Sequence, residues 1–333
     1  MTATQHRTPA AAHAPGVRAA AVVGVLTVLI ALVAIAFALP AARSGPHDVP
    51  IGAAGPQAAG GQVAQMLEQK APGAFALSYF PGEEALRDAI ADREAYGGLV
   101  LPDRPGATPT MLIATGASPA VAQLLTQLGT RIGAELGAPV PIEDVAPPTA
   151  DDPRGAGLAA SALPITLAGI LPAVALLLAL PGRHVLQLGS AVAFAVVGAV
   201  TLAALLRFVL GSFDQNFWAV TAALALGIAA ALLFLLGLGA VFGRLGLAAG
   251  ALLAVLVGNP LSGLTSAPEM LPAGWGDLGQ LLPQGATATL LRSAAAFGGL
   301  GAPTSILVLS CWAVAGIALI GVAALRTADS RSR

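Results

Sequence analysis

The sequence predicts an α-helical polytopic membrane protein with six transmembrane helices and a mixed α/β extracytoplasmic domain between the first and the second. Three observations lead to this prediction. Of the 333 residues, 56% are apolar and only 10% are charged, with a mean hydropathy of +0.81, whereas a soluble domain has about 25% charged residues. A helix needs about 20 apolar residues to cross a bilayer, and six stretches reach or nearly reach this length. One polar segment of more than 110 residues separates the first stretch from the second.

The first span is expected at residues 19–39, directly after Arg18. A cleavage-like sequence near its end allows a signal-peptide interpretation. However, its 21 uninterrupted apolar residues exceed the roughly 7–15 of a signal sequence, so we expect an uncleaved anchor. The other five spans are expected at 158–180, 185–206, 218–240, 245–263 and 306–325.

Basic residues are distributed unevenly between the two sides of these spans, and short cytoplasmic loops are the ones enriched in Lys and Arg. With the N-terminus inside, the short external loops hold only Arg207 and Arg292. The inner side then holds Arg7, Arg18, Arg183, Arg244, Arg326, Arg331 and Arg333. We therefore expect cytoplasmic tails at 1–18 and 326–333. The excess of Arg over Lys and the abundance of Ala favour a bacterial genome, and hence the bacterial plasma membrane.

The predicted membrane domain, residues 158–325, contains one irregular span. Its helix should break at Gly258-Asn259-Pro260, because proline removes a backbone donor and clashes with the preceding turn. Broken backbone at membrane depth is tolerated only against protein or a water-filled cavity. The following residues, 264–302, are too polar to span and too apolar for a free loop. They predict short re-entrant or interfacial helices on the outer side.

Residues 41–157 are predicted to form the extracytoplasmic α/β domain, because their apolar patterns alternate in the order βαβαββα. The expected strands are 49–53, 75–80, 96–101 and 110–114, and the expected helices are 57–69, 82–93 and 118–136. Glu83 and Arg87 have the spacing of a helical ion pair. Residues 141–153, which are rich in proline, are expected to form a linker back to the membrane.

Several classes of function are excluded by residues that are rare or missing. A net charge of −1 excludes a cationic nucleic-acid binder. The single cysteine, Cys311, excludes a disulfide framework and a cysteine-built zinc site, and no histidine lies beside a nucleophile. The chain has no GxxxxGK(S/T) phosphate loop and no Asp, Glu, Lys or His well inside a predicted span. We expect no enzyme, metal or cofactor, and any energy source should lie in another subunit.

The order of one anchor, a large α/β domain and five further spans resembles the ABC type-2 exporter permeases, in particular the branch related to the YhgE/Pip phage-infection proteins. Two stretches carry the resemblance. The first is YFPGEEALRDAIADREAYGGLVLP, in which a helix of the EAxxAIxxxxxYG kind leads into a strand. The second is GNPLSGLTSAPEMLPAGWGDLGQLLPQGATATLLRSAAAFGG, which resembles the family's broken fifth span and the short outer helices that follow it.

The resemblance implies the membrane subunit of an exporter. Two such subunits, as a homodimer or a heterodimer in the lipid bilayer, would form a pathway for a lipidic, drug-like or envelope-related compound, powered by a cytoplasmic ATPase subunit. The connection at 181–184 is too short for the coupling helix typical of the family, and no amphipathic elbow precedes the first span. The alternative is a non-transporting scaffold or receptor whose α/β domain binds an envelope or secretion partner.

Two sets of residues are candidates for a functional site. If a pathway exists, we expect its outer gate around the broken span. The residues expected at this gate are Asn259, Pro260, Ser262 and Glu269. Arg207 and Asp214 are candidates for an ion pair across the outer ends of the third and fourth spans. Alternatively, Arg207 extends to the membrane interface and Asp214 caps the next helix.

Overall fold

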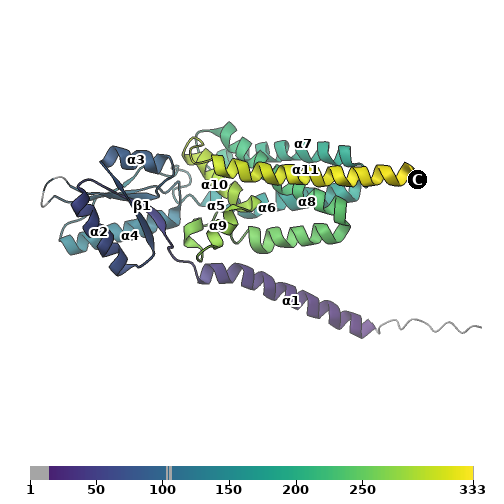
Figure 1. The fold of residues 1–333 in the computed structure, drawn as a ribbon, viewed down its shortest axis with the longest axis horizontal. Coiled ribbons are helices and arrows are strands. Elements are labelled where there is room, and N and C mark those ends of the chain that lie inside the picture. Colours follow the sequence, from purple (N-terminus) through teal and green to yellow (C-terminus); the bar gives the residue numbers. More distant parts are fainter. Residues whose placement is uncertain (1–14, 103, 105–106, 333) are drawn as a thin grey trace, which may run out of the picture.

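The computed structural model describes residues 15–102, 104 and 107–332. The chain forms a small α/β domain at one end of a long bundle of apolar helices (Figure 1). Five helices are long and apolar enough to cross a membrane, which makes the chain a multi-pass membrane protein. Most of the predicted N-terminal tail, residues 1–14, lies outside the described residues.

The α/β domain contains a five-stranded sheet and three helices. The strands lie in the order β2-β1-β3-β4-β5; the β3–β4 pair is antiparallel and the other pairs are parallel. The strands are β1 (Val49–Ala54), β2 (Phe75–Phe80), β3 (Gly97–Val100), β4 (Thr110–Ile113) and β5 (Ile142–Asp144). The helices are α2 (Gln57–Lys70), α3 (Glu83–Ala91) and α4 (Pro119–Leu136). The predicted order βαβαββα is confirmed as far as α4.

Local sequence signals explain the best-defined helix of this domain. Ser118 begins α4, since its Oγ accepts a hydrogen bond from the Val121 amide at 3.3 Å. Gly137 ends the helix in the left-handed conformation, with φ at 69°. Leu125 of α4 and Leu112 of β4 are fully buried in the same core. The helix is therefore fixed by its two caps and by one apolar face.

The segment 141–153 is only partly the linker that its prolines predicted. The three residues of β5 pair in parallel with β4 and complete the edge of the sheet. Asp144, the last of them, accepts hydrogen bonds from the amides of Thr115 and Ala146 through Oδ1, at 3.1 and 3.2 Å. The sequence did not reveal this strand because three residues are too few to show a period-two pattern.

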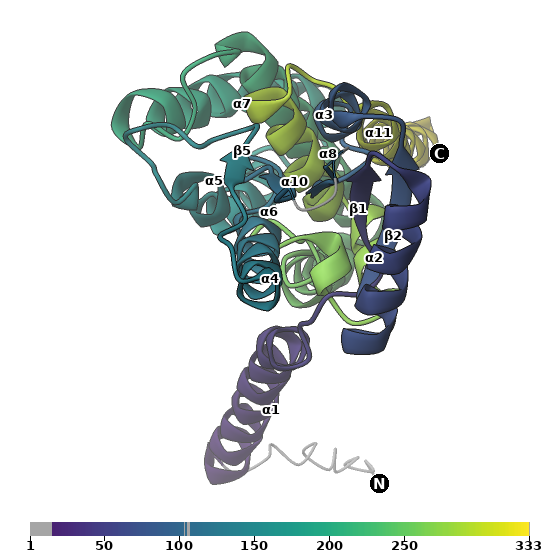
Figure 2. The same cartoon turned by 90° about the vertical axis from the view of Figure 1, so that its left-hand side faces the viewer.

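The bundle is built around α8, which packs against α6, α7, α10 and α11. Its elements are α1 (Pro15–Ala42), α5 (Ala156–Ala160), α6 (Ala162–Ala179), α7 (His184–Ala204), the π-helical turn η1 (Leu205–Val209), α8 (Phe217–Leu253), the π-helical turn η2 (Ala254–Gly258), the 3-10 turn η3 (Pro268–Met270), α9 (Trp275–Gln280), α10 (Pro283–Ala296) and α11 (Pro303–Ser332). Helix α1 stands apart from the others (Figure 2), and its main contact is with η2. We call the end of the bundle beside the α/β domain the domain end, and the opposite end the far end.

Helix α8 contains a break at Gly243, where the chain reverses direction. Gly243 has φ 64° and ψ −150°, a conformation that is essentially restricted to glycine. After it the chain runs back along α8, since a Cβ on Gly250 would lie 2.7 Å from the side chains of Leu235 and Leu238. The returning segment, 244–258, is roughly 22 Å long at 1.5 Å per residue. Five helices meet the length of a span, and one of them, Phe217–Gly258, includes this returning segment.

The last two predicted regions differ in outcome. Residues 264–302 do contain short helices, namely η3, α9 and α10. The last helix is longer than the predicted span, which ends at Leu325. Helix α11 continues to Ser332 without interruption and extends past its neighbours at the far end (Figure 1). No proline or glycine follows Leu325 to stop the helix, so the expected tail 326–332 is helical.

Candidate functional site

Helix α10 begins inside the bundle. A Cβ on Gly227 would collide with the side chain of Thr287, so α8 and α10 are in close contact there. Gly227 lies ten residues after the first residue of α8, Phe217, which is roughly 15 Å along the helix. Thr287 lies in the first turns of α10. The helix therefore starts at this depth and runs outward to the domain end.

An uncharged amide is buried where α10 begins. Gln284, in the first turn of α10, is only 8% exposed. A Cβ on Gly258, at the end of η2, would collide with this amide. Burying a neutral amide costs far less than burying an isolated charge. Gly258 thus leaves the space that Gln284 fills.

The expected gate residues Asn259, Pro260 and Ser262 form the turn that follows η2. The Ser262 Oγ donates to the Asn259 carbonyl at 2.8 Å and accepts from the Leu264 amide at 3.3 Å. Ser262 is 5% exposed, so its hydroxyl serves the turn. The structure therefore places these three residues together, directly after the Gly258–Gln284 contact.

Glu269, the fourth expected gate residue, lies elsewhere, against the α/β domain. Its Oε2 accepts a hydrogen bond from the Tyr96 hydroxyl at 2.7 Å, and its carbonyl accepts from the His47 amide at 2.9 Å. Burial and the neighbouring carboxylate raise the pKa of Tyr96, so this hydroxyl stays protonated and donates. The predicted gate is thus divided between the interior of the bundle and the contact with the α/β domain.

Arg292 of α10 is the most deeply buried charge in this region, at 4% exposure. Its Nη2 donates to the carbonyls of Gly263, Leu264 and Ser266, at 2.9, 2.6 and 3.2 Å. Burial lowers the pKa of Arg292 to about 10, so the guanidinium remains charged at neutral pH. The same Ser266 carbonyl accepts from the Ser118 hydroxyl at 2.7 Å. Arg292 therefore holds the segment after the broken span, which in turn contacts Ser118, the residue that caps α4.

Arg93 approaches α10 from the α/β domain. Its Nη1 donates to the Thr289 carbonyl at 2.9 Å and to the Ser293 Oγ at 2.7 Å. The guanidinium carbon also lies 5.6 Å from the centre of the Phe297 ring, within the range of a cation–π contact. Burial lowers the pKa of Arg93. Together, Arg93, Tyr96, Glu269 and Arg292 form what we call the junction between the α/β domain and the bundle.

The predicted ion pair between Arg207 and Asp214 does not form. Within the described residues the two side chains are not within 4 Å, and the Arg207 Nη1 donates instead to the Phe213 carbonyl at 2.7 Å. Asp214 does not cap the next helix either, because α8 begins after Asn216 and has no side-chain cap. Arg207 lies in the π-helical turn η1, whose widened backbone brings its guanidinium to the loop carbonyl.

A wide apolar groove lies between α6 and α7. Its volume is about 750 Å³. Pro172, inside α6, removes one backbone hydrogen bond from that helix. The residues that line the groove are mostly apolar: Pro164, Leu167, Ala168, Leu171, Pro172, Ala175, Leu176, Ser190, Phe194, Val197, Gly198, Thr201 and Leu202. The groove lies on spanning helices, so lipid chains would be its natural surroundings.

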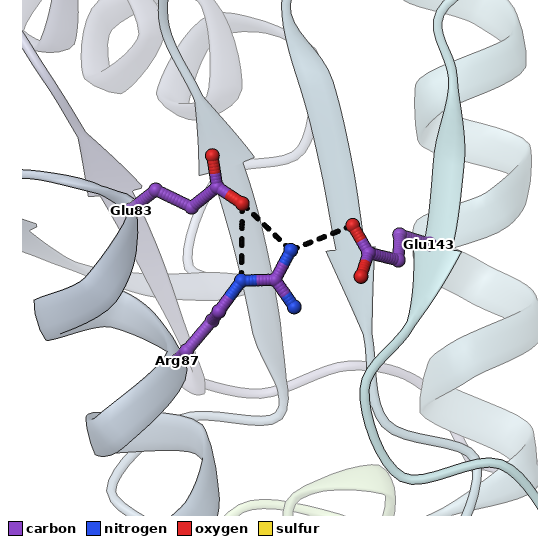
Figure 3. Close-up of polar contacts among 3 residues, drawn as sticks. All are labelled: Glu83, Arg87 and Glu143. Atoms are coloured by element: carbon purple, nitrogen blue, oxygen red, sulfur yellow. Dashed lines mark hydrogen bonds and ion pairs between the residues drawn. The ribbon is translucent and has the colours of Figure 1, made fainter.

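A second charged cluster lies within the α/β domain (Figure 3). Arg87 of α3 contacts Glu83 on its own helix and Glu143 of β5, both at 2.6 Å from Nη2. The helical pair Glu83–Arg87 was predicted; the partner from β5 was not. The two carboxylates raise the pKa of Arg87, and Arg87 lowers the pKa of Glu143. This cluster joins α3 to β5 at the edge of the sheet.

Comparison of the chain with models of protein families, with curated proteins and with solved structures found no match. A functional interpretation therefore rests on the geometry described above. Three features support a functional interpretation: the buried start of α10, the junction, and the groove between α6 and α7.

The sequence did not single out Arg93, Tyr96 or Gln284, and it gave Arg292 only as an external loop charge. One signal was present: Arg292 is a lone charge in an otherwise uncharged stretch, which is typical of a charge that bonds to protein. Arg93 carried no such signal, because it lies among other charged residues in the run DREAYG. Its partner, Ser293, is 200 residues away.

Proposed function

We propose that the chain is the membrane subunit of an exporter that moves a lipidic, drug-like or envelope-related compound across the bacterial plasma membrane. In this proposal the α/β domain lies outside and both termini lie in the cytoplasm. The segment 244–258 is the fifth of six crossings. Two copies, identical or related, form the pathway, and a separate cytoplasmic ATPase drives it.

The main observation in support of the proposal is that helix α10 begins inside the bundle. Helix ends within a membrane are tolerated only where protein or a water-filled cavity surrounds them. Transport proteins place such discontinuous helices at their substrate pathways. Here Gln284 and Thr287 bring polar groups to that end, opposite the π-helical turn η2 and its Gly258. This arrangement supports a pathway beside α10.

The groove between α6 and α7 supports an apolar substrate class. Its lining from Pro164 to Leu202 offers few polar groups besides the Ser190 and Thr201 hydroxyls. An apolar compound that dissolves in the bilayer could reach the groove sideways and pack against its side chains without leaving an apolar environment. We therefore expect a lipid or an amphipathic compound.

One observation favours the alternative of a non-transporting scaffold or receptor. The far end offers little for an ATPase to dock on: α6 ends at Ala179, α7 begins at His184, and α8 reverses at Gly243. None of these connections is long enough for a coupling helix. Helix α11 is the exception, since its last turns extend past the other helices and carry Arg326. In the exporter proposal, α11 is therefore the contact for the ATPase.

A bulky substitution that fills the groove tests whether the transported compound passes through it. Thr201 lines the groove and is exposed, whereas Val200, the preceding residue, is exposed and is not among the lining residues. We expect Thr201→Trp to reduce ATP-dependent movement of a fluorescent phospholipid in inverted native membrane vesicles at least roughly tenfold, because a Trp side chain occupies the space of an acyl chain. Val200→Trp should leave the rate unchanged. Equal rates for the two variants and the wild type would exclude the groove as the route.

A further inference from the structure

A second, polar cavity lies at the junction. Its volume is about 220 Å³, and both parts of the molecule line it. The α/β domain contributes Arg93 and Tyr96, and the bundle contributes Glu269, Asp277 and Gly301. Gly301 lies two residues before α11 begins, so the cavity sits level with the domain ends of the spanning helices.

Three charged groups, Arg93, Glu269 and Asp277, line this cavity, and among the described residues they form no direct ion pair with one another. Arg93 is half-buried, and its Nη1 is already bonded to α10. Its Nε and Nη2 make no hydrogen bond within the described part of the chain. Glu269 uses only Oε2, toward Tyr96, and Asp277 on α9 has no hydrogen-bond partner among the described residues. The free donors and acceptors therefore face the same space.

These opposite charges are not in contact. Within the described residues no ion pair closer than 4 Å joins Arg93 to Glu269 or to Asp277. Asp277 is exposed, whereas Arg93 and Glu269 are partly buried, and a charge that loses water is costly to leave without a partner. A cation alone in the cavity would face Arg93, and an anion alone would face two carboxylates. A molecule that carries both charges satisfies all three groups.

We propose that this cavity binds a small zwitterion, with its ammonium group on Glu269 and Asp277 and its phosphate group on Arg93. Guanidinium binds phosphate through paired N–H donors, and an ammonium group supplies up to three donors to the carboxylates. The position of the cavity beside the ends of spanning helices favours the phosphoethanolamine group. This group occurs both in lipid headgroups and in free phosphodiesters. Its binding requires no transport and no ATPase.

The direct test is calorimetric titration of the full chain, purified in a detergent without aminophospholipid. The probe is glycerophosphoethanolamine, which carries both charges. Glycerol 3-phosphate and ethanolamine carry one each and serve as controls. We expect saturable binding of the probe and at least roughly tenfold weaker binding of either control, since each charge-assisted hydrogen bond is worth about 1.4 kcal/mol or more.

Two substitutions assign the binding to this cavity. Asp277→Asn removes an exposed charge that holds no structural contact among the described residues, so the variant should fold. Glu269→Gln removes the charge and keeps an acceptor for Tyr96. Each should weaken binding roughly tenfold, whereas Glu84→Gln, on the exposed side of α3, should not change it. Repeating the titration in nanodiscs with and without phosphatidylethanolamine identifies the source, because a lipid headgroup in the site would abolish binding of the free probe.

The proposal is overturned by any of three results: no saturable binding of the probe, binding of a singly charged control as tightly as the probe, or equal affinity in the wild type, Asp277→Asn and Glu269→Gln.

Discussion

Arg292 shows how one side chain can hold two parts of a membrane protein together. Its guanidinium satisfies three carbonyls of a segment that has no regular secondary structure. We expect Arg292→Leu to lower the free energy of unfolding by about 2–4 kcal/mol, because leaving a buried acceptor without a donor costs about 1–3 kcal/mol. Chemical denaturation of the full chain in detergent measures this. Arg154→Leu, at an exposed arginine, should change stability by less than about 0.5 kcal/mol; equal effects would contradict the role of Arg292.

Glu143, at the edge of the sheet, should make the stability of the folded state depend on pH. Its hydrogen bond to Arg87 lowers its pKa below the usual 4.5. A carboxyl group with a lowered pKa in the folded state contributes stability above its ordinary pKa and loses this contribution as the pH falls below it. We expect Glu143→Gln to melt at a lower temperature than the wild type at pH 7, and this difference to shrink as the pH falls below 4.5.

Melting temperatures of the wild type and Glu143→Gln, measured from pH 7 to below pH 4.5, test this prediction. The control is Glu84→Gln, because Glu84 is exposed on the same helix as Arg87 and has no ion-pair partner among the described residues. A difference for Glu143→Gln that did not change with pH would show that the ion pair does not stabilise the domain.

At the scale of elements, close packing of α8 and α11 depends on glycine. A Cβ on Gly316 would collide with the backbone of Leu233 and Phe234, and a Cβ on Gly237 would lie 2.7 Å from the Gly316 carbonyl. We expect Gly316→Val to destabilise the bundle by about 1–3 kcal/mol, because the helices must separate. On the same helix, Gly321→Val meets nothing within 4 Å and should be neutral in the same thermal unfolding measurement. Equal melting temperatures for the two variants would contradict this packing.

Helices and strands could be predicted from the sequence where apolar periodicity or a capping residue defines them. The helices and the first four strands of the α/β domain follow from apolar periodicity, and Ser118 marks the start of α4. Strand β5 and the reversal at Gly243 did not follow, because pairing and packing across the sequence determine them. Of the residues expected at the gate, Asn259, Pro260 and Ser262 lie in one turn, whereas Glu269 contacts Tyr96. The sequence could not predict this separation, because it depends on a contact between residues far apart in the chain.

At the scale of the whole molecule, the α/β domain is fixed to the bundle through α10, and α10 reaches into the bundle beside α8. A change in the α/β domain would therefore act on the same helix that begins at Gln284. In the exporter that we propose, this connection would coordinate the α/β domain with the pathway, and a separate ATPase would drive transport.

The most direct test of that claim is gentle detergent purification of the chain from its native membrane, followed by mass spectrometry and an ATPase assay. We expect a stoichiometric nucleotide-binding subunit and vanadate-sensitive ATP hydrolysis. Truncation after Leu325, which removes the end of α11, should release that subunit and leave the rest of the assembly intact. A homogeneous assembly without any nucleotide-binding subunit would contradict the exporter proposal and support the scaffold or receptor.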